Sequence, residues 1–344
     1  MSQALLWCSV PLAALVGFAA HRASVCTVRA VAEMLSNRRA WMLASFAKTV
    51  LWVMALAVPL AWWSGRGLGD SALFPLTAAA LLGGFVFGVG AALNGGCAFS
   101  TLAHLADGHV VMLGTLGGFC VGAALWLLQG GPPTPAATYF HEPRPWHAAL
   151  VLGIWLWAAY ELRRLWRSRT SERPSWRMLG ATRYRLSTAA ACMGLCGGLL
   201  YTLNGSWTHT TTLERGVGWA LGKDVPPGVW LLGLFAALFA GMLFSGWQRK
   251  ALRVRAAPWR AWLRHTLAGV LMGAGAAGIP GGNDALILHA APAWSPHAVP
   301  AYATLLAGVA FGLIMMRRVT GMSLVVRCRG DVCESEAVEE ARRD

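Results

Sequence analysis

Long apolar runs separated by short polar stretches account for almost the whole chain. About 20 helical residues cross the hydrocarbon core of a bilayer, and nine runs approach or exceed that length. They cover residues 4–20, 41–63, 73–93, 110–128, 147–162, 187–203, 229–247, 265–279 and 299–316. A segment within the bilayer must satisfy its backbone hydrogen bonds internally, which favours helices. The pattern therefore predicts an all-α polytopic membrane protein with about nine transmembrane helices.

Four further segments are too polar for a full span and too apolar for a free loop. They cover residues 21–39, 94–109, 204–216 and 280–289. Interrupted backbone at membrane depth is tolerated only where it is buried in protein or lines a cavity. We therefore expect four short re-entrant half-helices, with a substrate site where the helices are interrupted.

Two of the interrupted segments resemble each other in sequence. Residues 84–97 read GFVFGVGAALNGGC, and residues 269–283 read GVLMGAGAAGIPGGN, with glycines at a constant offset of 185 before one inserted residue. A weaker similarity links the segment around Cys26 to residues 204–216. Helices one to four thus correspond to helices six to nine, and the single helix between them inverts the second copy. Inverted repeats are typical of transporters, whose sites lie at interrupted helices near the bilayer midplane.

The repeat divides the chain into four parts. These are a first transmembrane repeat at 1–129, a linking helix and basic loop at 130–185, a second, inverted repeat at 186–318 and a tail at 319–344. The basic stretches lie at 38–39, 163–185, 249–264 and 317–318, whereas the loops at 64–71, 130–146, 220–228 and 292–298 are poor in Lys and Arg. Basic loops face the cytoplasm. This predicts an N-terminus outside and a C-terminus inside.

Composition supports a membrane protein and excludes other classes. The 344 residues are 56% hydrophobic and 13% charged, against about 25% charged in soluble domains. The net charge of +14 comes from clusters between apolar runs, and no basic-aromatic motif accompanies it, so nucleic-acid binding is not expected. The eight cysteines form no CxxC and mostly sit in apolar runs, so we expect neither a disulfide framework nor a metal site. No phosphate-binding loop or cofactor motif is present in the sequence.

Two cysteines occupy positions that favour a role in binding. Cys97 follows Gly95 and Gly96, which let the backbone turn and approach a ligand closely. The half-helix that starts there offers free N–H groups and a positive dipole end to an anion, and Cys26 lies similarly in the first short segment. Thiols are soft, weak donors that suit a sulfur-containing anion. For the remaining membrane cysteines, namely Cys8, Cys120, Cys192 and Cys196, a role as small buried hydrophobes is favoured.

Charged residues in and around these segments are further functional candidates. Arg22 and Arg29 flank Cys26, and they either attract an anion, neutralise Glu33 or extend to the membrane interface. Lys48 lies inside the second span and is a functional candidate for the same reason. The spacing of His104, Asp107 and His109 suggests a metal site only weakly, and a cap or loop role is favoured.

Polar residues at the other interruptions are further candidates. Ser100 follows Cys97 on the second half-helix. Thr208, His209 and Thr210 either donate hydrogen bonds to an oxyanion or satisfy interrupted backbone. Asn283 can donate to an oxyanion, whereas an ionised Asp284 repels one unless it is paired.

Three motifs resemble the YeeE/YedE family of bacterial inner-membrane sulfur-compound transporters. They are HRASVCTV at 21–28, LNGGCAFSTLAHLADG at 93–108 and GAGAAGIPGGN at 273–283, and the resemblance extends from about residue 5 to 318. It implies nine long helices, four short segments and a pseudo-twofold repeat in the inner membrane. It also implies thiosulfate import, with cysteines at the constrictions passing the anion along through S–H···S hydrogen bonds.

Carried over by position, the first two family cysteines fall on Cys26 and Cys97, and the third falls on Asn283. A relay of three thiols therefore cannot operate here. Either Asn283 substitutes as a neutral N–H donor, or the substrate differs from thiosulfate.

Three functions remain open from the sequence. The leading one is a transporter of thiosulfate or a related sulfur anion, with Cys26 and Cys97 as contacts. The second is a transporter of another small solute, such as a selenium compound or a different anion. The third is a membrane enzyme or scaffold that handles sulfane sulfur with a cytoplasmic, TusA-like sulfur-carrier protein. It would use Cys328 or Cys333, although a solvated tail is the favoured interpretation of that segment. The leading interpretation is a transporter and not an enzyme, and neither a coupling ion nor an oligomeric state can be read from the residues.

Overall fold

Long helices surround a set of short ones. The computed structural model describes residues 6–64, 73–130, 145–167, 181, 183–224, 226–329 and 331–339. Within these residues the long helices are α2 (Ser9–Ala23), α4 (Trp41–Ser64), α5 (Ala78–Asn94), α7 (Met112–Gly130), α8 (Pro145–Arg167), α10 (Leu186–Asn204), α12 (Val229–Gln248), α13 (Trp259–Gly278) and α15 (Ala298–Thr320). The fold is an all-α polytopic membrane architecture, as predicted.

Seven helical stretches in the described part of the chain are long and apolar enough to cross a membrane. They are Ser9–Asn37, Trp41–Trp63, Ala78–Ala106, Met112–Gly130, Leu186–Ala220, Val229–Gln248 and Ala298–Thr320. Helices α8 and α13 are of similar length but carry more charge, since α8 ends in Glu161, Arg163, Arg164 and Arg167 and α13 begins with Arg260 and Arg264. Nine long helices are therefore present among the described residues, and seven helical stretches are apolar enough throughout to cross a membrane.

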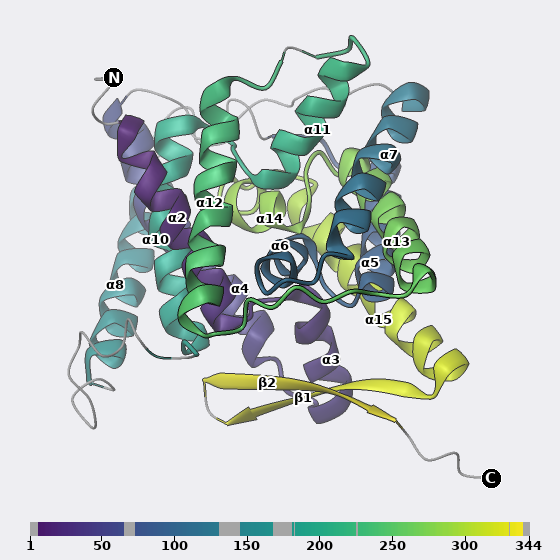
Figure 1. Cartoon of the computed structure of the whole chain (residues 1–344). Helices are drawn as coiled ribbons and strands as arrows, with labels where there is room; N and C mark the ends of the chain where they lie inside the picture. Colours follow the sequence, from purple (N-terminus) through teal and green to yellow (C-terminus); the bar gives the residue numbers. More distant parts are fainter. Residues whose placement is uncertain are drawn as a thin grey trace.

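The four predicted half-helices are short helices that begin at the predicted interruptions. They are α3 (Thr27–Asn37), α6 (Ala98–Ala106), α11 (His209–Ala220) and α14 (Asn283–Ala285), which continues as the π-helical turn η1 (Leu286–Ala290). In Figure 1, α6 and α14 lie in the middle of the molecule with the long helices around them, and the two helices contact each other. Helix α3 lies toward one end of the molecule and α11 toward the other (Figure 1).

Some predicted boundaries were wrong. The third long helix begins at Ala78 rather than residue 73, because Thr77 caps it by accepting a hydrogen bond from the N–H of Ala80 at 3.1 Å. The eighth begins at Trp259, so part of the expected basic loop at 249–264 is helical. Helix α8 likewise extends five residues into the expected loop at 163–185, most of which lies outside the described residues, as do nearly all of the loops expected at 64–71 and 130–146.

The expected polar tail after residue 318 is instead a β-hairpin. Strands β1 (Met322–Arg329) and β2 (Val332–Glu339) pair antiparallel and pack across the end of α3 (Figure 1). Cys328 and Cys333 face each other in the strand register and form a disulfide, so the expectation that the cysteines form no disulfide was wrong for this pair. The hairpin also holds the Asn37 side-chain amide through the carbonyl of Val326.

The long helices pack against one another in pairs. Helix α2 packs against α12 and α10 against α4, while α5 packs against α15 and α13 against α7. The equivalent helices α2 and α10 also contact each other, as do α5 and α13. Under the 185-residue offset found in the sequence, the α2–α12 contact corresponds to α10–α4, and the α5–α15 contact corresponds to α13–α7.

Glycines allow these helices to approach backbone to backbone. A Cβ added at any of four repeat glycines would overlap a carbonyl oxygen on the partner helix. Gly84 and Gly88 meet Ala301 and Leu305 of α15, and Gly269 and Gly273 meet Thr115 and Phe119 of α7. Ala301 and Thr115 are 186 residues apart, as are Leu305 and Phe119, and this spacing is close to the offset of 185 between the glycines. Close contacts between small residues drive helix association where no hydrophobic effect operates between helices.

Candidate functional site

The N-termini of the short helices meet in the interior. Cys26 is the N-cap residue of α3, Cys97 that of α6 and Thr208 that of α11, and each has extended backbone. Gly282 precedes α14 in the same way. Free backbone N–H groups and the positive dipole end of a helix attract anions. The interior therefore brings several such helix ends together.

The two candidate cysteines contact each other. Their thiols lie close enough to interact, and both residues are 1% exposed. Ser100 lies within reach of both, with its hydroxyl 3.5 Å from Cys97 Sγ. Two half-helices that are distant in sequence thus present their thiols at one point.

Glycine is required at the turn before Cys97. Gly95 has φ +74°, a left-handed conformation that ends α5. Gly96 lies against the side chain of Ser100, where an added Cβ would come within 2.8 Å. Asn94 stabilises the same turn by donating to Thr101 Oγ1 at 2.9 Å and accepting from Thr115 at 2.7 Å.

Asn283 joins this group from the second half of the chain. Its Nδ2 donates to Thr27 Oγ1 at 3.3 Å, one residue after Cys26. Its Oδ1 is buried without a hydrogen-bond partner among the described residues. Tyr302 of α15 also lies beside Thr27 and both thiols. Asn283 is therefore one contact away from the thiol pair.

The third half-helix binds a carboxylate rather than leaving its threonines open. Thr210 Oγ1 donates to Asp284 Oδ1 at 2.7 Å, and His209 Nδ1 lies 2.9 Å from Asp284 Oδ2. Thr210 also accepts the N–H of Gly282 at 3.1 Å. Thr208 caps α11 together with Thr211 in a reciprocal capping box. In this state the Thr208 and Thr210 hydroxyls stabilise backbone and a buried charge.

Arg22 is tied to α12. Its Nε donates to Ser245 Oγ at 2.8 Å, and its remaining nitrogens contact Gln248 and the carbonyl of Ala181. Glu33 caps the start of α4 by accepting the backbone N–H groups of Trp41 and Met42. Among the described contacts Arg22 therefore anchors helices and does not neutralise Glu33.

His104, Asp107 and His109 do not converge on a metal site. Asp107 pairs with His21 at 3.1 Å, and His109 lies 2.7 Å from Arg255, whose charge together with partial burial lowers the pKa of His109. The ring of His104 lies 5.5 Å from that of His109 in an edge-on contact. Within the described residues, potential metal ligands gather at Glu33, Cys328 and Cys333, where the disulfide occupies both thiols.

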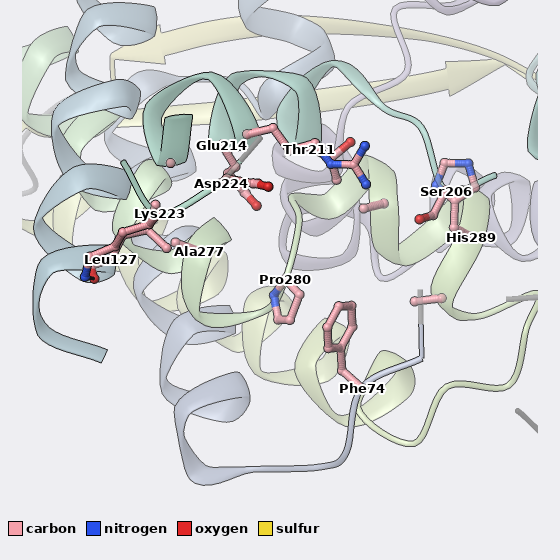
Figure 2. Close-up of a pocket in the computed structure, with 14 residues that line it drawn as sticks. Phe74, Leu127, Ser206, Thr211, Glu214, Lys223, Asp224, Ala277, Pro280 and His289 are labelled. Carbon is pink, nitrogen blue, oxygen red and sulfur yellow. Dashed lines mark hydrogen bonds between the residues drawn. The ribbon is translucent and has the colours of Figure 1, made fainter. Parts of the chain in front are cut away.

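Two cavities approach the junction of short helices from opposite ends. One, of about 150 Å³, opens beside the hairpin and is lined by His21, Arg29, Ser100, His104, Arg249 and Cys333, among others. The other, of about 170 Å³, has Glu214, Lys223 and Asp224 on one wall, Pro280 and Phe74 opposite, and His289 at its far end (Figure 2). No described residue lines both cavities. The thiol pair, Asn283 and Asp284 lie buried between them.

Sequence reasoning missed several residues of this site. The Phe99 ring packs against the His209 ring in a tilted contact, with ring centroids 5.0 Å apart, and so connects α6 to α11. Glu214 and His289 line the cavity of Figure 2. Each of these three lies on a half-helix that the sequence had singled out, and that position was the available signal. Tyr302 lies on a long span, and nothing in its local sequence marks it.

The half-buried Lys48 forms an ion pair with the buried Glu161 that holds α4 to α8. Its Nζ contacts Glu161 and lies 2.8 Å from Ser187 Oγ of α10. Replacing Glu161 with alanine leaves an unpaired charge, and we expect the free energy of unfolding to fall by about 3 kcal/mol. Unfolding of detergent-solubilised protein by a denaturant series measures this.

The matched controls for Glu161 are Arg164→Ala, which removes an exposed neighbour, and the double change Lys48→Met with Glu161→Leu. The double variant should recover most of the lost stability, because both charges are gone. Equal losses in the single and double variants would show that the ion pair itself is unimportant.

Comparison with known proteins adds one positive result. A family profile described as sulphur transport matches residues 22–311. The matched region includes both candidate thiols, all four half-helices and Asn283. No curated protein matches the chain significantly.

Proposed function

Because the chain belongs to the sulphur transport family, we propose that this sulfur-compound transporter imports thiosulfate or a closely related sulfur-containing anion. The observation that carries the proposal is the contact between the Cys26 and Cys97 thiols at two half-helix N-termini. The anion would pass between the two cavities through this point. Nothing in the proposal requires a bond to be made or broken, so the protein acts as a transporter and not as an enzyme.

The chemistry of the junction suits the two ends of thiosulfate. Its terminal sulfur is a soft, polarisable acceptor that two thiols and the Ser100 hydroxyl can contact. Its oxygens suit the free N–H groups at the starts of the short helices. An anion that enters between them would accept hydrogen bonds from both thiols, and these bonds are strong because the acceptor is charged.

Asn283 supports a modified relay on this path. Its amide already donates to Thr27, and a small rotation would direct the same N–H group at an anion held by Cys26. A neutral N–H donor binds oxygen better than sulfur. We therefore propose that Asn283 contacts the oxyanion end, while the thiols contact the sulfur end.

An inverted repeat of residues 1–129 and 186–318 accounts for the arrangement. It is supported by the exchange of helix pairs and by the matching contacts of the repeat glycines. The Arg-bearing cavity beside the hairpin then faces the cytoplasm and the cavity of Figure 2 faces the periplasm, with the protein in the inner membrane. Arg29, Arg249 and His104 would attract the anion on the cytoplasmic side, where a TusA-like sulfur carrier could receive it.

A ligand panel on purified protein tests the substrate. Thiosulfate should raise the apparent melting temperature in detergent, since a ligand that binds only folded protein stabilises it. Sulfate and chloride at equal ionic strength are the controls. Radiolabelled thiosulfate should also enter proteoliposomes that contain the protein and not empty ones. Stabilisation and uptake with a selenium compound or another anion, but not with thiosulfate, would instead support the alternative of a different small solute.

A further inference from the structure

Four ionisable side chains, three of them buried, connect the cavity of Figure 2 to the junction of short helices. Glu214 and His289 line the cavity (Figure 2), and His209 Nδ1 lies 2.9 Å from Asp284 Oδ2. Asp284 is 0% exposed, His209 1% and His289 2%. Glu214 and His289 both interact electrostatically with Asp284. The group therefore forms one continuous, electrostatically linked cluster.

Several polar atoms of this cluster are buried without a hydrogen-bond partner among the described residues. They include Glu214 Oε1, His209 Nε2 and His289 Nδ1. Burying an unpaired polar atom destabilises a protein, and ionisable groups at membrane depth are expensive and mark ion or proton pathways. A purely structural role is therefore unfavourable for three side chains at once.

The position of Asp284 creates a second difficulty. Asp284 follows Asn283, whose amide contacts Thr27 beside the thiol pair. An ionised carboxylate this close to the path repels an entering anion strongly, because screening is weak in the interior. A proton bound by Asp284 or by its partner His209 removes or offsets that repulsion. Anion binding and proton binding at this place therefore favour each other.

Import of a dianion also needs a source of energy. The cell interior is negative, and moving one charge through 100 mV corresponds to about 2.3 kcal/mol. For two negative charges, equilibrium accumulation is reduced by more than about a thousandfold. Each proton carried with the dianion cancels one of its two charges and so lowers this electrical cost.

From these observations we propose that the His209–Asp284 pair is the proton-binding site of a proton–anion symport, reached from the outer cavity through Glu214 and His289. This inference rests on the proposed function. A proton passes from the cavity to the Asp284–His209 pair, the anion binds at the thiols, and both leave toward the Arg-bearing cavity. The proton changes carriers without any redox step.

The groups around the pair are consistent with this role. Arg215 of α11 lies near Glu214. Lys223 and Asp224, which follow α11 in the chain, lie on the cavity wall. Toward the junction, α6 presents Phe99 and the Cys97 thiol, and α12 presents Phe235, whose ring lies 6.2 Å from that of His209. On α13, His265 contacts Asn94 at 2.8 Å instead, and α7 contributes only Cys120 as a titratable side chain. No other carboxylate of these described elements faces the pair.

Proteoliposomes with an imposed pH gradient test the proposal. With wild-type protein, a pH one to two units lower outside should raise the initial rate of labelled thiosulfate uptake about tenfold over uptake at equal pH. A pH-sensitive dye trapped inside should report acidification that requires both protein and thiosulfate. This measurement needs no variant, so it does not depend on how a mutant folds.

Variants locate the site. Asp284→Asn and His209→Gln should each bring the ratio of uptake with and without the gradient close to one. His147→Gln, a buried histidine of α8 that stacks on Trp62, should keep the wild-type ratio. Thiosulfate uptake by wild-type protein that ignores the gradient and leaves internal pH unchanged would overturn the symport but leave the proposed function intact. Absence of any thiosulfate movement would overturn both.

Discussion

Replacing Cys97 with alanine is expected to lower the rate of thiosulfate uptake by roughly 10- to 100-fold, and cells that depend on thiosulfate for sulfur should stop growing. A hydrogen bond to a charged group contributes about 1.5–3 kcal/mol. Cys97 is the N-cap residue of α6, and its thiol lies beside that of Cys26. Alanine removes the donor without adding volume. The loss should therefore fall on transport and not on folding.

Two matched controls accompany Cys97→Ala: removal of a different thiol, and replacement of Cys97 by serine. Cys120→Ala on α7 removes a partly buried thiol far from the junction and should leave uptake unchanged. Cys97→Ser keeps a hydrogen-bond donor but loses the soft sulfur, so its uptake should lie between those of wild type and alanine. Cys26→Ala should resemble Cys97→Ala, because the two thiols act together. Normal growth of the Cys97→Ala strain on thiosulfate would eliminate the thiol contact from the mechanism.

The glycine contacts make an equally strong prediction for stability. Gly118 and Gly117 are neighbours on α7, but an added Cβ at Gly118 would overlap the carbonyl oxygen of Thr266, whereas Gly117 has open space around it. Gly118→Ala forces α7 and α13 apart, which typically costs about 1–3 kcal/mol or more. We expect the apparent melting temperature in detergent to fall by roughly 2–10 °C, measured by the loss of monodisperse protein on heating.

Gly117→Ala is the control for Gly118, since it changes the same helix by the same atoms. It should leave the melting temperature within about 1 °C of wild type, because surface substitutions usually change stability by less than 0.5 kcal/mol. Equal behaviour of the two variants would mean that α7 and α13 do not depend on backbone contact at this position.

Apolar length and glycine patterns were sufficient to predict the helical framework. A run such as 229–247 has one plausible structure in a bilayer, and the helix there covers Val229–Gln248. The interruptions at Cys26 and Cys97 were visible because polar residues in an apolar run are costly. The match between the glycines of 84–97 and 269–283 placed the two halves in correspondence, although only the structure gives the partner carbonyls.

Side-chain partners that are distant in sequence could not be predicted in the same way. Nothing local indicates that Thr210 donates to Asp284 or that the Phe99 ring contacts that of His209, since these contacts depend on how half-helices that are distant in sequence meet. Arg22 next to Cys26 suggested an anion contact, but side-chain reach directs it to Ser245 and Gln248 instead.

The C-terminal hairpin has a signal in the sequence, namely alternation with a period of two. Two stretches of alternating residues, MSLVVRCR and VCESEAVE, flank Gly330 and Asp331 in the sequence. A Gly-Asp pair between such stretches is typical of a two-residue hairpin turn. The register then places Cys328 opposite Cys333. Polarity alone suggested a solvated tail, and the period of two was the stronger clue.

The contacts between these glycines and backbone carbonyls also have a consequence for the speed of transport. Helices that touch through backbone atoms lack the long, adaptable side chains that would let one half slide past the other. Domain rocking takes microseconds to milliseconds, whereas side-chain rotations take picoseconds to nanoseconds. A framework locked along α5, α7, α13 and α15 leaves the thiols, Asn283 and the His209–Asp284 pair as the parts free to change position. The passage of each anion would then be timed by a few local rotations within an otherwise stationary protein.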